Sequence, residues 1–249
     1  MDKLMNRLRA EVASNKDVAI VQERSWHVPL VAYEVSFERV KRLKMDILMK
    51  MLLLAFQEAD IRRPAALAEM LFVEELFIRD LIDKMHSTQL IHLDATGYRL
   101  TDKGRSHLEE GIFEEAMEDG ETIVSFNAVH DEYQVVEELF EEKADDLPAY
   151  RYARDQKAET VRIHEVLKQE KNSAEEGYQV IVTGISTCDE LGVEYIPCLE
   201  FQLYDRKQDL FYARVWNTRL GTWDEALQLE IEEKELIEWR EAMKHAATP

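Results

Sequence analysis

The chain of 249 residues carries 31 Lys and Arg against 51 Asp and Glu, so its net charge at pH 7 is -20. This acidic balance argues against a general nucleic-acid coat and for a soluble protein. The length suits one large domain or two small ones, and an apolar content of 46% predicts a packed core and excludes global disorder. The charge is uneven, because residues 1–110 sum to about -1 and residues 111–249 to about -19.

The cysteine content and the N-terminal residues predict the compartment. Cys188 and Cys198 are the only cysteines, too few for a disulfide scaffold and suited to a reducing compartment. Residues 1–10 lack the apolar stretch of a secretory signal, and the longest apolar run, residues 51–56, is far short of a membrane span. We therefore expect a cytoplasmic protein that does not associate with a membrane.

The first predicted elements are a short helix within residues 1–17 and two strands, 19–21 and 30–35, around a turn at 25–29. A long helix is predicted over residues 37–59, because apolar residues of its second half recur at helical spacing. Its first half holds the densest basic cluster of the chain. The cluster is either a phosphate-facing patch or a solvated helix flank, and its members are Arg39, Lys41, Arg42, Lys44 and Lys50.

Residues 62–110 predict a helix, a second helix and a β-hairpin, in that order. Pro64 suits the first turn of a short helix over 65–70, and a longer helix follows over 73–85. In the longer helix a stripe of apolar residues is predicted to be buried, namely Phe77, Ile78, Leu81, Ile82 and Met85. The hairpin combines residues 90–93 and 98–100, with Gly97 at a turn position that needs a positive φ. Thr101 is the predicted N-cap of a helix over 102–117.

The tract from Tyr98 to Leu108 resembles the wing-to-helix junction of winged helix-turn-helix regulators of the broad MarR and PadR kind. The matching residues are Leu100, Thr101, Gly104 and Arg105. The resemblance extends over about residues 40–115 and implies a winged helix-turn-helix domain that binds double-stranded DNA. The basic side chains expected to contact DNA are Arg39, Lys41, Arg42, Lys44, Arg62, Arg63, Arg79, Lys84, Arg99, Lys103 and Arg105.

The second helix departs from this family pattern. A DNA-reading helix places its polar side chains against the major groove, yet this helix carries four acids and two bases. Phosphates would repel the four carboxylates, of Glu74, Glu75, Asp80 and Asp83. Winged helices also dock on proteins, so the departure keeps a protein partner open as the alternative.

The second half of the chain predicts a β-rich region. A strand over 121–129, a helix over 131–143, a loop at 145–148, a helix over 157–169 and a polar linker at 171–177 come first. Strands over 178–185, 193–203 and 210–216 and an acidic helix over 223–243 follow. We predict an α+β fold, in which a winged domain at 1–117 precedes a small acidic α+β domain with an antiparallel sheet at 118–249.

Few residue patterns of this chain indicate chemistry. His130, Asp131 and Glu132 are adjacent and so diverge in direction, and Asp131 capping the helix over 131–143 explains them more simply than a metal site. The two cysteines have no further zinc ligands at a recognisable spacing, and the glycines form no phosphate-binding loop. The sequence therefore predicts no enzyme, no cofactor and no metal.

Large aromatic residues near the C-terminus suggest a binding pocket or, alternatively, core packing. They are Tyr204, Tyr212, Trp216, Trp223 and Trp239. The segment around Arg214, Trp216 and Trp223 is the candidate ligand or partner site of the second domain.

Two functions fit these observations. The first is a transcription regulator that binds operator DNA as a symmetric homodimer, with an acidic domain that dimerises or senses a signal. The alternative is a non-enzymatic interaction module in which the winged helix docks on a protein.

Overall fold

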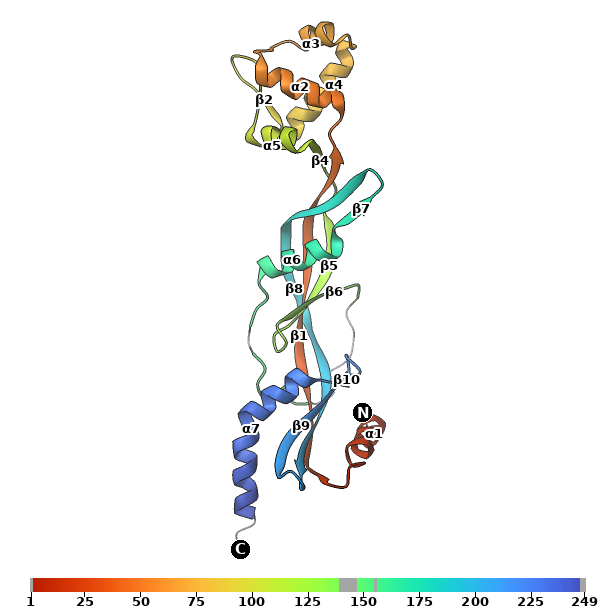
Figure 1. Cartoon of the computed structure of the whole chain (residues 1–249), viewed down its shortest axis with the longest axis vertical. Coiled ribbons are helices and arrows are strands. Elements are labelled where there is room, and N and C mark those ends of the chain that lie inside the picture. The colour runs from red at the N-terminus through yellow and green to blue at the C-terminus, as the bar shows by residue number, and fades with distance from the viewer. Residues whose placement is uncertain (1, 139–146, 155, 247–249) are drawn as a thin grey trace. The chain divides into compact units, whose positions relative to one another are not determined.

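The computed structural model describes residues 2–138, 147–154 and 156–246 (Figure 1). Within this part the chain forms an antiparallel sheet of eight strands, a separate two-stranded hairpin and seven helices. The helices are α1 (Asp2–Val12), α2 (Ile47–Glu58), α3 (Pro64–Leu71), α4 (Glu75–Ser87), α5 (Asp102–Glu110), α6 (Thr160–Lys171) and α7 (Glu225–Ala246). The strands are β1 (Val18–Lys44), β2 (Ile91–Leu93), β3 (Tyr98–Leu100), β4 (Ile112–Ala116), β5 (Gly120–Asn127), β6 (Glu132–Val136), β7 (Ser173–Glu175), β8 (Tyr178–Asp205), β9 (Leu210–Asn217) and β10 (Thr222–Trp223).

The predicted fold class is wrong. A winged domain followed by a small α+β domain was expected, but two strands of 27 and 28 residues, β1 and β8, dominate the structure. They are neighbours in a sheet with the strand order β10-β9-β8-β1-β5-β6, to which β4 adds at β1 and β7 at β8. The N-terminal region is therefore sheet rather than a winged helix-turn-helix.

Strand β1 is longer than predicted because its side chains alternate without a break. Trp26, Val28 and Leu30 are buried while the residues between them are partly exposed, so residues 25–29 continue the strand instead of forming a turn. The strand runs on to Lys44, where helix was predicted, and only residues 47–58 of the predicted helix over 37–59 are helical.

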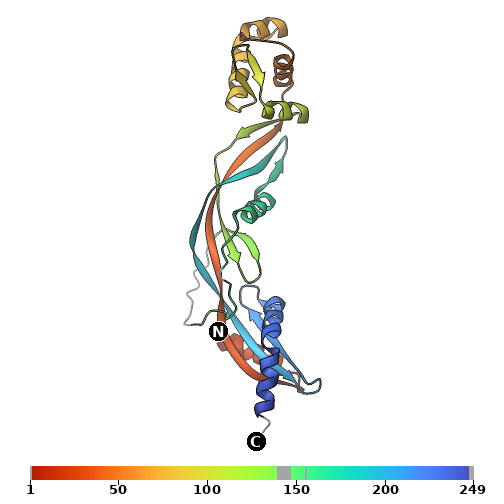
Figure 2. The ribbon, with the colours of Figure 1, turned by 90° about the vertical axis from the view of Figure 1, so that its left-hand side faces the viewer.

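The chain divides into two compact units. Unit 1 comprises residues 1–35, 122–163 and 188–249, and unit 2 comprises residues 36–121 and 164–187. In unit 1, α7 packs on β9, and apolar residues of α1 pack against residues of β8. In unit 2, one hydrophobic core joins α2, α4, α5 and the β2–β3 hairpin. These helices, orange to yellow-green in Figure 2, follow directly on β1 in the chain.

Residues 45–111 of unit 2, called the helical segment below, contain the local features that the sequence predicts. Pro64 occupies the first turn of α3, and Gly97 has a φ of 143° in the hairpin turn. The Thr101 hydroxyl accepts a hydrogen bond from the Gly104 N–H at 2.9 Å and so caps α5. Helix α5 ends at Glu110 rather than at 117, because Gly111 takes up the left-handed conformation that closes a helix.

Gly104 has a packing role in the helical segment. A Cβ at this position would lie 2.0 Å from the carbonyl oxygen of Leu90, the residue before β2. Only glycine lets α5 approach the hairpin backbone so closely. Close packing therefore explains the glycine of the matching tract without any contact to DNA.

The predicted helix over 131–143 is also wrong where it can be compared. Residues 132–136 form β6, which pairs with β5 in a register that places Tyr133 opposite Phe126. Asp131 has a φ of 53° in the turn between the two strands and therefore caps no helix there. Residues 139–143 of the predicted helix, and residues 145–146 of the predicted loop, lie outside the described residues.

Candidate functional site

The predicted basic cluster of residues 39–44 lies on strand β1, so its members alternate between the two faces of the sheet. The Arg39 guanidinium donates to the Glu118 carbonyl oxygen at 2.9 Å, and Lys41 Nζ lies 4.0 Å from the centroid of the Tyr178 ring. Arg42 is paired with Glu114, whereas Lys44 has no ion-pair partner among the described residues. The prediction that these residues lie together on one flank of a helix is therefore wrong, because residues 39–44 are in a strand.

Most of the other basic candidates are neutralised by nearby carboxylates. Ion pairs join Arg79 to Glu75, Lys84 to Glu115, Arg99 to Asp60 and Arg105 to Asp102. The Arg62 guanidinium donates to the Thr96 carbonyl oxygen at 3.0 Å. Arg63 and Lys103 have no side-chain partner in the part of the chain that the structure describes. A phosphate backbone would have to compete with these carboxylates for most of the predicted contacts.

The turn between α3 and α4 carries the most prominent apolar surface of the helical segment. Four large side chains within eight residues are more than half exposed, and Phe72 reaches 97%. We call this surface the turn patch, and its residues are Met70 (63%), Phe72 (97%), Leu76 (69%) and Phe77 (53%). Clustered exposed apolar side chains of this kind mark interaction surfaces more often than singly scattered ones.

Phe72 also has an unfavourable backbone conformation. It follows the last residue of α3 with φ 54° and ψ 42°, in the left-handed region that glycine and asparagine usually occupy. A bulky residue there is strained. The chain thus places a strained aromatic residue in solvent, where packing within the described structure gives it no compensation.

The exposure of Phe77 corrects the predicted burial of α4. Ile78, Ile82 and Met85 are buried as expected, Leu81 is partly buried, and Phe77 faces solvent. Helix α2 shows the same effect, because Ile47 and Met51, two of the apolar residues that recur at helical spacing in the predicted helix over 37–59, are 75% and 45% exposed. On both helices the stripe of apolar residues is wider than the face that packs against the core, so some of its residues are exposed.

Three exposed acidic residues lie within three positions of turn-patch residues in the sequence. Glu69, Glu74 and Asp80 are exposed and have no ion-pair partner within the described residues. The whole helical segment holds twelve Asp and Glu against eight Lys and Arg. The exposed positions that adjoin the patch in the sequence therefore carry negative charge.

His130 forms a buried polar cluster in unit 1 rather than a metal site. Its Nε2 lies 2.9 Å from Asp224 Oδ2, and its Nδ1 lies 2.8 Å from Asn127 Nδ2. The Asn127 Oδ1 accepts backbone N–H groups of Val129 and His130, which orients the amide so that Nδ2 donates to the ring. The hydrogen bond with Asp224 raises the pKa of His130, whereas the Asn127 amide requires an unprotonated Nδ1.

The described residues place no nucleophile in this cluster. Burial of Asp224 opposes its charge, but hydrogen bonds from His130 and Asn217 outweigh that effect and lower its pKa. Burial raises the pKa of the Cys198 thiol, which keeps it protonated, and no hydroxyl or thiol is hydrogen-bonded to His130 among the described residues. Asp224 also accepts from the Leu227 N–H, so the cluster fastens the β5–β6 turn to the start of α7. Within the described residues no group of three or more His, Cys, Asp or Glu side chains is arranged to hold a metal ion.

The structure brings the candidate site Arg214, Trp216 and Trp223 together, under helix α1. The Arg214 guanidinium lies 4.4 Å from the Trp223 ring centroid, and the two tryptophan rings meet edge to face at 5.3 Å. The α1 side chains cover them, since Arg7 lies over Trp216 and Glu11 accepts the Trp223 indole N–H at 3.1 Å. The two tryptophan rings are half-buried and pack beside the apolar cluster of α1 and β8. This arrangement fits core packing, the alternative to a binding pocket in the sequence analysis.

Sequence reasoning missed a buried ion-pair cluster in unit 1. Arg151 donates to both carboxylate oxygens of Glu200, at 2.7 and 2.9 Å, and pairs with Glu235 through its Nε. Glu200 and Glu235 are 2% and 5% exposed. Glu235 lies four residues after Ile231 and four before Trp239, on the apolar stripe of α7. A charged residue within an apolar stripe is the sequence feature that could have predicted a buried ion pair here.

No protein-family model, curated protein or solved structure matches this chain. The predicted membership of the winged helix-turn-helix regulators is therefore wrong. It has no support from a family model, and the 27-residue strand β1 occupies residues 18–44 of the region 1–117 that was predicted as a winged domain. The matching tract was short, and its Thr101 and Gly104 serve local capping and packing. None of the described helices is both long and apolar enough to cross a membrane.

Proposed function

We propose that this protein is a non-enzymatic interaction module whose helical segment docks on a protein partner through the turn patch. The observation that carries the proposal is the 97% exposure of Phe72 together with its left-handed backbone. Strained residues persist where function retains them, and an aromatic residue at the centre of a patch is the usual anchor of a protein interface.

The acidic residues that adjoin the turn patch in the sequence support a partner of defined chemistry. Glu69, Glu74 and Asp80 flank the apolar side chains, so the complementary surface is an apolar pocket with Lys or Arg at its edge. Charges at such an edge steer the encounter, while the buried aromatic residue supplies most of the affinity.

Duplex DNA is the alternative occupant of the helical segment. Arg63 and Lys103 of this segment, together with Lys44 at the adjoining end of β1, favour it, because their side chains are exposed and without an ion-pair partner in the described residues. Three separated cations beside a surplus of carboxylates would give weak, salt-sensitive binding. We rank this function second.

The test is affinity capture from cells with the wild-type chain and two variants. Phe72→Ser removes the anchor of the turn patch, and Ile237→Ser removes another exposed apolar residue, from α7, where Ile237 is 73% exposed. A partner that binds the wild type and Ile237→Ser, but not Phe72→Ser, supports docking through the patch. Sedimentation of the purified protein then distinguishes a second copy of this chain from a different partner.

A parallel titration with random-sequence duplex DNA tests the alternative. The docking proposal expects no binding that depends on Arg63 and Lys103. Steeply salt-dependent binding that Arg63→Ala and Lys103→Ala weaken, with no partner that depends on Phe72, would overturn the proposal in favour of DNA.

A further inference from the structure

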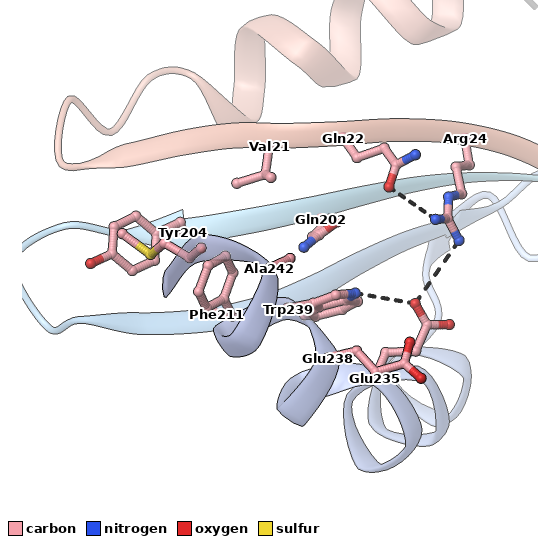
Figure 3. Close-up of a pocket in the computed structure, with 11 residues that line it drawn as sticks. Val21, Gln22, Arg24, Gln202, Tyr204, Phe211, Glu235, Glu238, Trp239 and Ala242 are labelled. Atoms are coloured by element: carbon pink, nitrogen blue, oxygen red, sulfur yellow. Dashed lines mark hydrogen bonds and ion pairs between the residues drawn. The ribbon is translucent and has the colours of Figure 1, made fainter. Parts of the chain in front are cut away.

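A groove in unit 1, independent of the turn patch, has the shape and chemistry of a small-molecule site. Its volume is about 650 Å³, within the range of ligand pockets. Figure 3 shows β1 on one side and α7 on the other, with residues of β8 and β9 between them. The lining residues that matter below are Arg24, Gln202, Tyr204, Phe211, Glu238 and Trp239.

The groove has one apolar end and one polar end. Tyr204 and Phe211 stand at the apolar end, with ring centroids 4.7 Å apart (Figure 3). Arg24 stands at the polar end, near Glu235 and the indole N–H of Trp239 (Figure 3). A ligand that fills the groove must therefore have an apolar body and a polar head.

The hydrogen bonds already formed at the polar end indicate which polar group a ligand would need. The carboxylate of Glu235 already accepts from three donors, namely Arg151, the Tyr152 hydroxyl at 2.8 Å and the Trp239 indole at 3.2 Å. Arg24 is not saturated: it donates once to Gln22 at 2.9 Å, and its nearest ion-pair contact with Glu235 is 3.9 Å long. A guanidinium has five N–H groups, so most of its donors are free for a ligand.

Gln202 adds a second free polar group on the floor of the groove. The residue is only 8% exposed, and its side-chain amide has no hydrogen-bond partner among the described residues, although it is not one of the fully enclosed unpartnered groups. The amide therefore stays open to water or to a ligand in the groove. Arg24 and Gln202 together offer donors to an acceptor-rich group.

We propose that this groove binds a small molecule that carries a carboxylate on an apolar chain or ring. The carboxylate accepts hydrogen bonds from Arg24, because the planar guanidinium group matches the geometry of a carboxylate. The apolar body lies along Tyr204, Phe211 and Trp239. Glu238, exposed at the rim, opposes the ligand charge through solvent and so limits the affinity without setting the specificity.

The test is calorimetric titration of the full-length protein with octanoate, using octanol and octylammonium as head-group controls. Octanoate is expected to bind at least tenfold more tightly than either control. Arg24→Gln is expected to remove that preference, with a loss of about tenfold, the value of one charged hydrogen bond at a partly exposed site. Glu238→Gln is expected to tighten octanoate binding a few-fold.

A control variant on the same helix separates local from general charge effects. Glu241 is exposed on α7 but does not line the groove, so Glu241→Gln is expected to leave octanoate binding unchanged. Equal binding of octanoate and octanol, no binding of octanoate, or an unchanged affinity in folded Arg24→Gln would each overturn the proposal. Gln202→Leu gives a second check, because it removes the amide while preserving an apolar floor, and it is expected to weaken octanoate but not octanol.

Discussion

Arg42 and Glu114 stand directly opposite each other on the antiparallel strands β1 and β4, and the Arg42 Nε donates to Glu114 Oε1 across 2.8 Å. This cross-strand pair shows why a cluster of basic residues in the sequence does not become a basic surface. The strand divides the cluster between two faces, and the Glu114 carboxylate of β4 pairs with Arg42. Residues 39–44 therefore form no single basic face.

Replacing Phe72 with asparagine is expected to stabilise the protein. Asparagine tolerates the left-handed conformation that strains a phenylalanine, and the change removes an exposed apolar ring. The free energy of unfolding should rise by about 1 kcal/mol in urea denaturation.

The matched control for this variant is Phe77→Asn, since Phe77 is also exposed but lies within α4, where asparagine is no better than phenylalanine. Phe77→Asn should not raise the free energy of unfolding. A loss of stability in Phe72→Asn would show instead that the ring packs within the chain.

Gly104→Ala is expected to destabilise unit 2. The new methyl carbon would meet the Leu90 carbonyl oxygen at 2.0 Å, so α5 and the hairpin must move apart. A loss of about 1–3 kcal/mol, typical of overpacking, should appear in chemical denaturation. Gly192→Ala, where an added Cβ meets nothing within 4 Å, should change stability by less than about 0.5 kcal/mol, and an equal effect of the two would refute the packing role of Gly104.

Glu235→Gln is expected to destabilise unit 1 in a pH-dependent manner. Burial of Glu235 disfavours its charge, but hydrogen bonds from Arg151 and Tyr152 outweigh this and lower its pKa below the ordinary 4.5. Loss of the carboxylate should cost about 2–4 kcal/mol at neutral pH, because Arg151 loses one of its two carboxylate partners.

The sign of the pH dependence follows from the lowered pKa. The carboxylate of Glu235 contributes stability above pH 4.5, and this contribution is lost as the pH falls through the folded-state value. The difference in unfolding free energy between wild type and Glu235→Gln should therefore shrink below about pH 4.5. The exposed Glu233→Gln on the same helix serves as control, and a difference that stays constant down to pH 3 would exclude the ion-pair account.

Local structure was predictable from this sequence where a single residue determines it. Pro64, Gly97 and Thr101 act through their own backbone or side chain, and each has the role that its chemistry indicates. The positions of α3, α4, β9 and α7 followed from periodicity to within a few residues.

The tertiary arrangement was not predictable in the same way. Strand β1 is one continuous strand because β8, β4 and β5 supply its hydrogen-bond partners, and those partners are distant in the sequence. The exposure of Phe77 depends on which face of α4 packs against the core, and the ion pair between Arg151 and Glu200 joins segments that are distant in the sequence. Neither can be predicted from local sequence patterns. The sequence indicates Tyr204 and Trp239 as possible pocket residues, whereas Arg24, which gives the groove its proposed specificity, precedes them by 180 and 215 residues on β1.

The most direct measurement of the central claim is site-specific photo-crosslinking in cells, with a photoreactive phenylalanine analogue at position 72. The same analogue at position 237 on α7 serves as the control. Docking through the turn patch predicts a discrete protein adduct at position 72 that is absent at position 237 and is lost when Leu76 and Phe77 are changed to serine. An absence of any adduct specific to position 72, in a variant that is folded and expressed like the wild type, would contradict the claim.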